Sequence, residues 1–167
     1  MPPARKPKKT SHTKQPLIVV LNGPNLHLLG KRETHIYGDA DWAQIEKKLQ
    51  ALSKTLGIRI EIHHDDHEGH LIERLHRYAQ KADAIVLNPG GLSHVSVALR
   101  DAVAASPIPV IEVHVSNLAR REQFRSHSYI SAVSSGIIMG FGILGYEMAL
   151  WAAHKKVGER RNARGSK

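Results

Sequence analysis

The sequence predicts an α/β domain in which a five-stranded parallel sheet carries helices on both faces. Five short apolar runs alternate along the chain with stretches whose apolar residues recur at helical spacing, and most of the connections between them are short. This alternation is typical of a parallel sheet with right-handed crossovers. The chain has 167 residues, which suits one domain with a real hydrophobic core.

The five predicted strands are the apolar runs, which read as strands buried on both faces. They lie at 17–22 (LIVVLN), 58–64 (IRIEIHH), 84–88 (AIVLN), 109–115 (PVIEVHV) and 136–141 (GIIMGF). Five such strands in a chain of this length suggest a flavodoxin-like, doubly wound fold, which is a three-layer sandwich.

The predicted helices lie between the strands and after the last one. Their ranges are 41–56, 68–81, 94–105, a short one near 117–125, and 143–156. In the first, apolar residues from Trp42 to Leu52 fall on one stripe of a helix. We predict that Asp65 caps the second helix, with Glu68 returning the bond, and that Ser93 caps the third.

The net charge of +9 is concentrated at the two ends of the chain. Residues 1–15 hold five bases and no acid, and 155–167 hold six bases and one acid, so the body between them carries about −1. Basic low-complexity ends are typical of solvated tails rather than of a nucleic-acid-binding face. We therefore predict disordered tails at 1–15 and 157–167 around one catalytic domain at 16–156. Nucleic-acid binding by the tails, with the body as scaffold, is the alternative.

Composition also limits the function classes. There is no cysteine, so no disulfide, thiolate nucleophile or cysteine-bound metal is available. No run is long enough to span a bilayer, and the first sixteen residues lack the apolar centre of a secretory signal. We expect a cytoplasmic protein without a membrane partner. The segment HHDDHEGH (63–70) holds metal-ligand residue types but lacks the HExxH spacing, so we predict no metal site.

One connection is unusually long. A loop of about fifteen residues with many polar side chains, GPNLHLLGKRETHIYG (23–38), separates the first strand from the first helix, where two to six residues are usual. In doubly wound sheets, ligands bind beyond the carboxyl ends of the strands. The first strand leads into Asn25, the third ends in Asn88-Pro89-Gly90-Gly91, and the fourth ends at His114. We therefore predict a site at this edge.

The residue types at this edge favour acid–base chemistry. The loops lack GxSxG, GxGxxG and GxxxxGK[ST], so acyl-transfer, dinucleotide and P-loop functions are weakly supported. A phenol with its ordinary pKa of about 10 becomes a usable base only beside cations, and Arg32, Arg121 and Arg125 are candidates to stand near Tyr37. The alternative is that Tyr37 anchors the loop and the arginines form a solvated surface.

Further residues and one turn at this edge suit such a site, and some of them also have a purely structural explanation. Glu112 lies two residues before His114, on the same face of a strand, as in an imidazole acid oriented by a carboxylate; a hydrogen-bonded structural histidine is the alternative. His94 is a second acid–base candidate, and the turn after Asn88 offers backbone N–H groups to a bound anion. Asp101 can equally be a salt-bridging helix residue.

Four blocks together resemble the type II 3-dehydroquinate dehydratases over nearly the whole body, from about Leu17 to about His154. They are LNGPNLHLLGKRETHIYG, VLNPGGLSHVSVALRDAV, IEVHVSNLARREQFRSHSYIS and GIIMGFGILGYEMAL. The resemblance implies a flavodoxin-like fold, no cofactor, and trimers assembled into a dodecamer. It implies dehydration of 3-dehydroquinate to 3-dehydroshikimate, in the shikimate pathway or quinate breakdown, by anti elimination through an enolate.

The resemblance also implies residue roles. Tyr37 would take the C2 proton, activated by Arg32, while Asn25 holds a water against the enolate oxygen. His114, oriented by Glu112, would protonate the leaving C1 hydroxyl. Arg121 would close over the site, Asp101 would reach in from a neighbouring subunit, and the substrate would be bound by Asn88, His94, Val115, Ser116 and Arg125.

In this interpretation the long loop is a lid that closes over the substrate and excludes water. The sequence departs from the family pattern at His27, Thr34 and Arg120, which puts lid closure and turnover in question rather than the reaction. The main rival is a flavodoxin-like binding or signalling module for phosphate or a nucleotide. That module has no need for Tyr37 with Arg32 or for Glu112 with His114.

Overall fold

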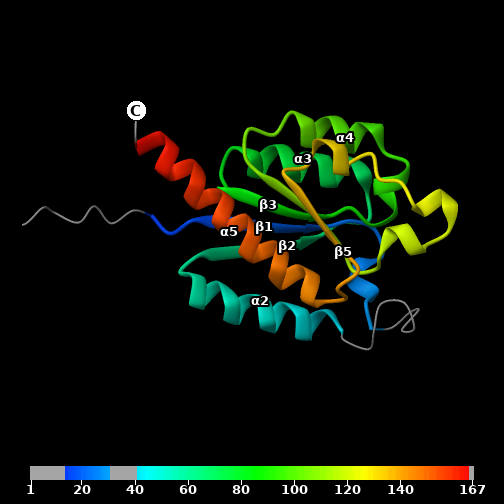
Figure 1. Cartoon of the computed structure of the whole chain (residues 1–167), viewed down its shortest axis with the longest axis horizontal. Coiled ribbons are helices and arrows are strands. Elements are labelled where there is room, and N and C mark those ends of the chain that lie inside the picture. The colour runs from blue at the N-terminus through cyan, green and yellow to red at the C-terminus, as the bar shows by residue number, and fades with distance from the viewer. Residues whose placement is uncertain (1–13, 31–40, 166–167) are drawn as a thin grey trace, which may run out of the picture.

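The structure is a computed structural model that describes residues 14–30 and 41–165. In this part of the chain five parallel strands form one sheet, in the order β2-β1-β3-β4-β5, between two helical layers (Figure 1). The predicted α/β, three-layer, flavodoxin-like fold is confirmed. The strands are β1 (Leu17–Asn22), β2 (Arg59–His64), β3 (Ala84–Asn88), β4 (Val110–His114) and β5 (Gly136–Met139).

Each face of the sheet is covered by a pair of helices. One pair is α2 (Trp42–Leu56) with α5 (Leu144–Gly165), and the other is α3 (Glu68–Ala79) with α4 (Val97–Ala104). Five short 3-10 turns complete the described elements: η1 (Leu26–Leu28), η2 (Gly90–His94), η3 (Leu118–Arg120), η4 (Gln123–Arg125) and η5 (Ser131–Val133). No helix in these residues is long and apolar enough to cross a membrane.

The core lies on both sides of the sheet, as the inner strand β1 shows, which is buried along its whole length. Ile18 and Val20 pack under α2 and α5, whereas Leu17, Val19 and Leu21 pack under α3 and α4. Successive side chains of a strand point to opposite faces, so one apolar run fills two core layers. This explains why the central strands read as continuous apolar runs rather than as alternating patterns.

The two caps predicted from the sequence are wrong, because a turn precedes each helix. His67 is the N-cap of α3, and the carboxylate of Asp65 instead accepts the N–H of His67 at 3.1 Å. Ser96 caps α4 by accepting a first-turn N–H at 2.8 Å. Ser93 lies one turn earlier, in η2, where its hydroxyl donates to the carbonyl of Gly90.

The last helix is longer than the sequence predicts, so the predicted disordered tail 157–167 is wrong as far as residue 165. Val157 is buried in the core, and Arg160 donates to a backbone carbonyl 53 residues earlier in the chain. Arg161 forms an ion pair with Asp83 at 3.0 Å. These partners are distant in sequence, so the basic composition of residues 157–167 could not reveal that the segment is ordered.

Candidate active site

A cavity of about 180 Å³ lies at the carboxyl ends of β1, β3 and β4. The predicted edge of the sheet is therefore the edge that carries the pocket. The cavity brings together eight of the predicted site residues: Asn25, Asn88, His94, His114, Val115, Ser116, Arg121 and Arg125.

The other four predicted residues have different positions. Arg32 and Tyr37 lie outside the described residues, as does the predicted N-terminal tail up to residue 13. Glu112 is fully buried and contacts His114 from behind the cavity wall. Asp101 lies on α4, away from this cavity, where its exposed carboxylate pairs with its neighbour Arg100 at 2.8 Å.

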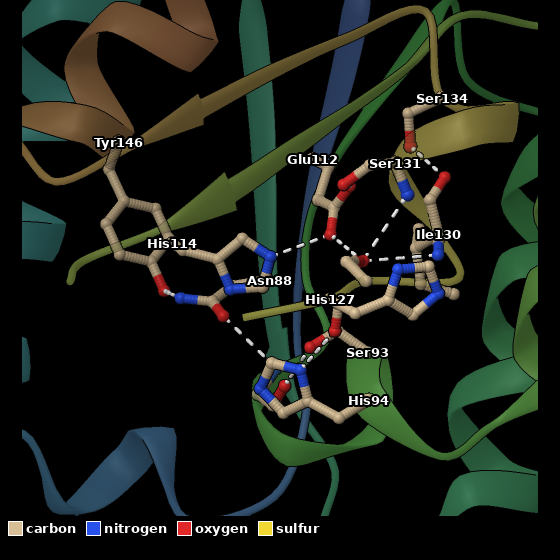
Figure 2. Close-up of polar contacts among 12 residues, drawn as sticks. Asn88, Ser93, His94, Glu112, His114, His127, Ile130, Ser131, Ser134 and Tyr146 are labelled. Carbon is tan, nitrogen blue, oxygen red and sulfur yellow. Dashed lines mark hydrogen bonds and ion pairs between the residues drawn. The ribbon is translucent and has the colours of Figure 1, made fainter. Parts of the chain in front are cut away.

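The two-residue spacing of Glu112 and His114 places both side chains on the same face of β4, as predicted. His114 Nε2 lies 2.7 Å from Glu112 Oε1, and the two residues are 5% and 0% exposed (Figure 2). Because an ionised carboxylate only accepts, the imidazole donates through Nε2–H. His114 Nδ1 is thus the ring nitrogen left for a proton exchange with a ligand in the cavity.

Two serines that sequence reasoning missed complete the surroundings of Glu112. Ser128 Oγ donates to Oε1 and Ser131 Oγ donates to Oε2, each at 2.6 Å. Burial alone would raise the pKa of Glu112, but hydrogen bonds from His114 and both serines outweigh it and lower that pKa below its ordinary value. The carboxylate is therefore ionised. The serines lie 16 and 19 residues after Glu112, beyond any periodic signal.

His94 has a defined tautomer. Its Nδ1 lies 2.7 Å from the carbonyl oxygen of His127, which can only accept, so Nδ1 carries the proton (Figure 2). Burial lowers the pKa of His94, the His127 carbonyl partly opposes this, and the charges of His114 and Arg125 lower it further. The neutral ring therefore has Nε2 as a hydrogen-bond acceptor on the cavity wall.

Asn88 is held by a network that the sequence did not indicate. Its Nδ2 donates to the phenol oxygen of Tyr146 at 2.8 Å (Figure 2). The phenol of Tyr146 in turn donates to Asn22 Oδ1 at 2.7 Å. Asn88 Oδ1 accepts the N–H of Gly90 at 3.2 Å. Of the backbone N–H groups that this turn was predicted to offer to an anion, that of Gly90 is therefore already bonded to the side chain of Asn88. Tyr146 is buried, which raises the pKa of its phenol.

Gly23 lets the loops after β1 and β3 approach each other closely. Its N–H donates to the carbonyl of Asn88 at 2.8 Å, and an added Cβ would stand 2.5 Å from the backbone oxygen of Pro89. Two residues later, Asn25 adopts the left-handed conformation with φ of 67°, which asparagine tolerates better than most residues. Its N–H donates to Asp66 Oδ1 at 2.9 Å, and these contacts fix the part of the cavity wall that Asn25 forms.

Two arginines give the cavity its positive charge. Arg121 Nη1 donates to Ser116 Oγ at 3.1 Å and its Nε to Glu122 at 3.2 Å, while Arg125 pairs with the same carboxylate at 3.5 Å. Glu122 is half exposed, so it offsets the two guanidiniums only in part. Such a pair suits a substrate carboxylate. Arg120 is exposed and is not part of the cavity wall.

Within the segment 63–70, Asp65 and His63 bond to other side chains. Asp65 pairs with Arg74 at 3.2 Å, and His63 Nε2 lies 2.6 Å from the phenol of Tyr78. Within residues 14–30 and 41–165, no three histidine or acidic side chains form a group with the spacing of metal ligands.

The sheet order and the cavity define a class: flavodoxin-like α/β proteins with a ligand cavity at the carboxyl edge of the sheet. Within that class, a family model described as "Dehydroquinase class II" matches residues 16–154, and the chain belongs to this family. The resemblance found in the four sequence blocks is thereby confirmed.

Relatives and solved structures agree with this assignment. The chain is 53% identical over 136 residues to a "3-dehydroquinate dehydratase" of Pelotomaculum thermopropionicum, covering 81% of this chain and 94% of the relative. It is 44% identical over 142 residues to a "Catabolic 3-dehydroquinase 2" of Aspergillus fumigatus, covering 85% and 95%. The type II dehydroquinase structure from Butyrivibrio crossotus matches with a TM-score of 0.81 at 40% identity, covering 83% of this chain and 97% of that one. That from Propionibacterium acnes has a TM-score of 0.79 at 42% identity, covering 86% and 99%.

Proposed function

We propose that this chain is a type II 3-dehydroquinate dehydratase, which removes water from 3-dehydroquinate to give 3-dehydroshikimate. The observation that carries the proposal is the buried Glu112–His114 pair beside a cavity that also holds Arg121 and Arg125. An ionised carboxylate behind an imidazole suits a general acid, and the arginines suit a carboxylate-bearing substrate. Membership of the dehydroquinase family supports the same reaction.

His114 is the proposed acid. Its Nε2–H is held by Glu112, so a proton delivered to the leaving hydroxyl comes from Nδ1. The negative charge of Glu112 stabilises the imidazolium that exists before this transfer. Protonation as the C1–O bond breaks turns hydroxide, a poor leaving group, into water.

Tyr37 is the proposed base and Arg32 its activator, a proposal that comes from the sequence blocks. The Tyr37 phenolate takes the C2 proton, and the electron pair of that bond forms the enolate. Asn25, on the cavity wall, holds a water against the enolate oxygen. The enolate then re-forms the carbonyl as the new double bond displaces the C1 hydroxyl on the opposite face. The steps balance as loss of water without net oxidation, so they need no cofactor.

The remaining cavity residues are proposed to bind the substrate. His94 offers Nε2 as an acceptor for a substrate hydroxyl, and Ser116 offers a hydroxyl. Arg125 pairs with the substrate carboxylate, Arg121 closes over it, and Asn88 and the backbone at Val115 complete the ring of polar contacts.

A direct assay tests the proposal. The purified protein is mixed with 3-dehydroquinate, and the ultraviolet absorbance of the conjugated enone product is followed, with and without borohydride treatment in the presence of substrate. We expect absorbance that rises and survives borohydride, because no Schiff base is formed. A well-folded protein that gives no absorbance would refute the proposal, and binding of phosphate or a nucleotide would then be measured for the rival module.

We also propose that the protein assembles as trimers and that these build a dodecamer. Exposed apolar side chains support assembly: Val95, Val97 and Phe124 are 71%, 57% and 69% exposed. Asp101 lies one turn after Val97 on α4, where it is placed to meet a neighbour rather than its own cavity. Sedimentation velocity of the wild type and of Val97→Asp tests this: we expect a large oligomer that the variant breaks up. A monomeric wild type would contradict it.

The cytoplasmic location expected from the sequence stays a prediction. Imaging a tagged copy of the full chain would test it.

A further inference from the structure

One short segment, His127 to Ser131, interacts with both cavity histidines. It bonds directly to His94, and it bonds to Glu112, the partner of His114. It follows η4 and ends at the first residue of η5. The carbonyl of His127 accepts from His94 Nδ1 at 2.7 Å. Four residues later the same segment reaches Glu112, the partner of His114, through Ser131 (Figure 2).

The direction of the Ser128 hydroxyl proton follows from its other contacts. Ser128 Oγ lies 3.2 Å from the N–H of Ile130 and 3.4 Å from that of Ser131, and these groups only donate. The hydroxyl accepts there, so its own proton points to Glu112 Oε1 at 2.6 Å. Ser131 Oγ approaches Oε2 at the same distance. Distances of 2.5–2.7 Å are those of charge-assisted O–H···O⁻ bonds.

The segment is anchored between these two serines. Ile130 is fully buried in the core under α3 and α4. The N–H of Tyr129 donates to the carbonyl of Ser93 at 2.9 Å, which ties the segment to the turn that ends at His94. Because the backbone between the two serines is anchored in this way, their hydroxyls are held at the carboxylate by the fold.

We propose that Ser128 and Ser131 are positioning residues for the acid step, holding Glu112 as a carboxylate turned toward His114. This inference rests on the proposed function of His114. With one donor on each oxygen and His114 as the third, the carboxylate has a single low-energy orientation. It keeps the proton of the neutral ring on Nε2 and leaves Nδ1 for the substrate. Loss of a hydroxyl leaves one oxygen of a fully buried carboxylate short of a donor, which favours its protonation or its rotation away from the ring.

The test compares Ser128→Ala and Ser131→Ala with the matched control Ser134→Ala. Ser134 lies in the same turn, but its hydroxyl donates to the backbone carbonyl of Ile130 at 3.0 Å rather than to Glu112. Turnover of 3-dehydroquinate is measured against pH, together with KM and the melting temperature. His94, which interacts electrostatically with both His114 and Glu112, and Arg125, which interacts with His94, are unchanged in all three variants.

We expect each of the two test variants to lose about 10- to 100-fold in kcat with KM nearly unchanged. The acidic limb of the pH profile should move up by about one to two pH units, because Glu112 protonates more easily without the donor. The control should keep the wild-type kcat and pH limb. Ser131→Thr, which retains a hydroxyl, should recover most of the loss caused by Ser131→Ala.

Wild-type kcat and an unmoved acidic limb in both test variants would overturn the inference. So would an equal loss in the control, since that would show general damage to the turn. An inactive wild type would refute the proposed function instead. The inference is then tested by the ¹⁵N resonances of His114, which should show Nε2–H in the neutral wild-type ring and a changed tautomer mixture in the alanine variants.

Discussion

Replacing Tyr146 by phenylalanine removes a single oxygen and keeps the packing of the ring. That oxygen is the bridge between Asn22 and Asn88, at the ends of the two central strands β1 and β3. Both amides are buried, with exposures of 0% and 2%, so water cannot replace the phenol. Asn22 Nδ2 remains bonded to the carbonyl of His63 at 3.3 Å, which opposes a compensating flip of its amide.

The cost follows from the two groups left without partners. A buried donor or acceptor that loses its partner costs about 1–3 kcal/mol, so for two such groups the free energy of unfolding should fall by about 2–6 kcal/mol. For a domain of this size, 1 kcal/mol moves the melting temperature by about 2–4 °C, so the melting temperature should fall by about 4 °C or more. KM for 3-dehydroquinate should rise, because Asn88 loses the contact that fixes its amide in the cavity.

Tyr78 provides the matched control. It is also a largely buried tyrosine, and its hydroxyl donates to Glu61 at 2.7 Å. Glu61 is 44% exposed, so water can take the place of the phenol, and Tyr78→Phe should cost only about 0.5–1.5 kcal/mol. Thermal and urea unfolding at one protein concentration, with KM measured alongside, compare the two variants. If Tyr146→Phe melted within 2 °C of the wild type, or if Tyr78→Phe cost as much, the reasoning about the buried bridge would be refuted.

Three further predictions follow from single features. Gly23→Ala should lose about 2 kcal/mol or more of stability and most turnover, because its Cβ would meet the backbone oxygen of Pro89 at 2.5 Å; a wild-type melting temperature would contradict this. Both ring nitrogens of His64 are buried and have no hydrogen-bond partner among the residues that the structure describes. Burial, and to a smaller extent the charge of His27, lowers the pKa of His64 to about 4. His64 therefore takes up a proton more readily in the unfolded chain than in the folded protein. As the pH drops from 6.5 to 4, the free energy of unfolding should fall by up to about 2 kcal/mol. In denaturation at several pH values, His64→Phe should flatten that dependence, and an unchanged slope would exclude His64 as its source. Deleting 157–167 should lower the melting temperature, because Val157 and the Arg161–Asp83 ion pair are lost; calorimetry showing no change would mean that this end of α5 adds nothing to stability.

The local pattern of apolar and polar residues was sufficient to predict the sheet and the edge that carries the cavity. The strands β1 and β3 begin and end at the predicted residues, because a run of apolar residues bounded by polar ones is a local signal. The edge followed from a rule of parallel sheets, that ligands bind at the carboxyl ends of the strands. The contact between Glu112 and His114 followed from the two-residue period of a strand.

The residue at which each helix begins was harder to predict. Asp65 and Ser93 are residue types that cap helices, yet each lies before the actual N-cap, which is His67 for α3 and Ser96 for α4. Their side chains bond within the preceding turn instead. Residue type shows that a capping side chain is available but not where the helical hydrogen bonds begin. That depends on how the preceding strand ends against its neighbours.

The sequence alone determined the fold class, the edge that carries the cavity and the contact between Glu112 and His114, since each depends on spacings of a few residues. Only the tertiary structure decided what holds that pair and its cavity in place. Ser131 reaches Glu112 across 19 residues, Tyr146 reaches Asn22 across 124, and Arg161 reaches Asp83 across 78. No local period links such residues, because they meet only when separate strands and helices have packed. The packed core fixes these partners at hydrogen-bond distance in the absence of water, and this makes the buried charge of Glu112 stable.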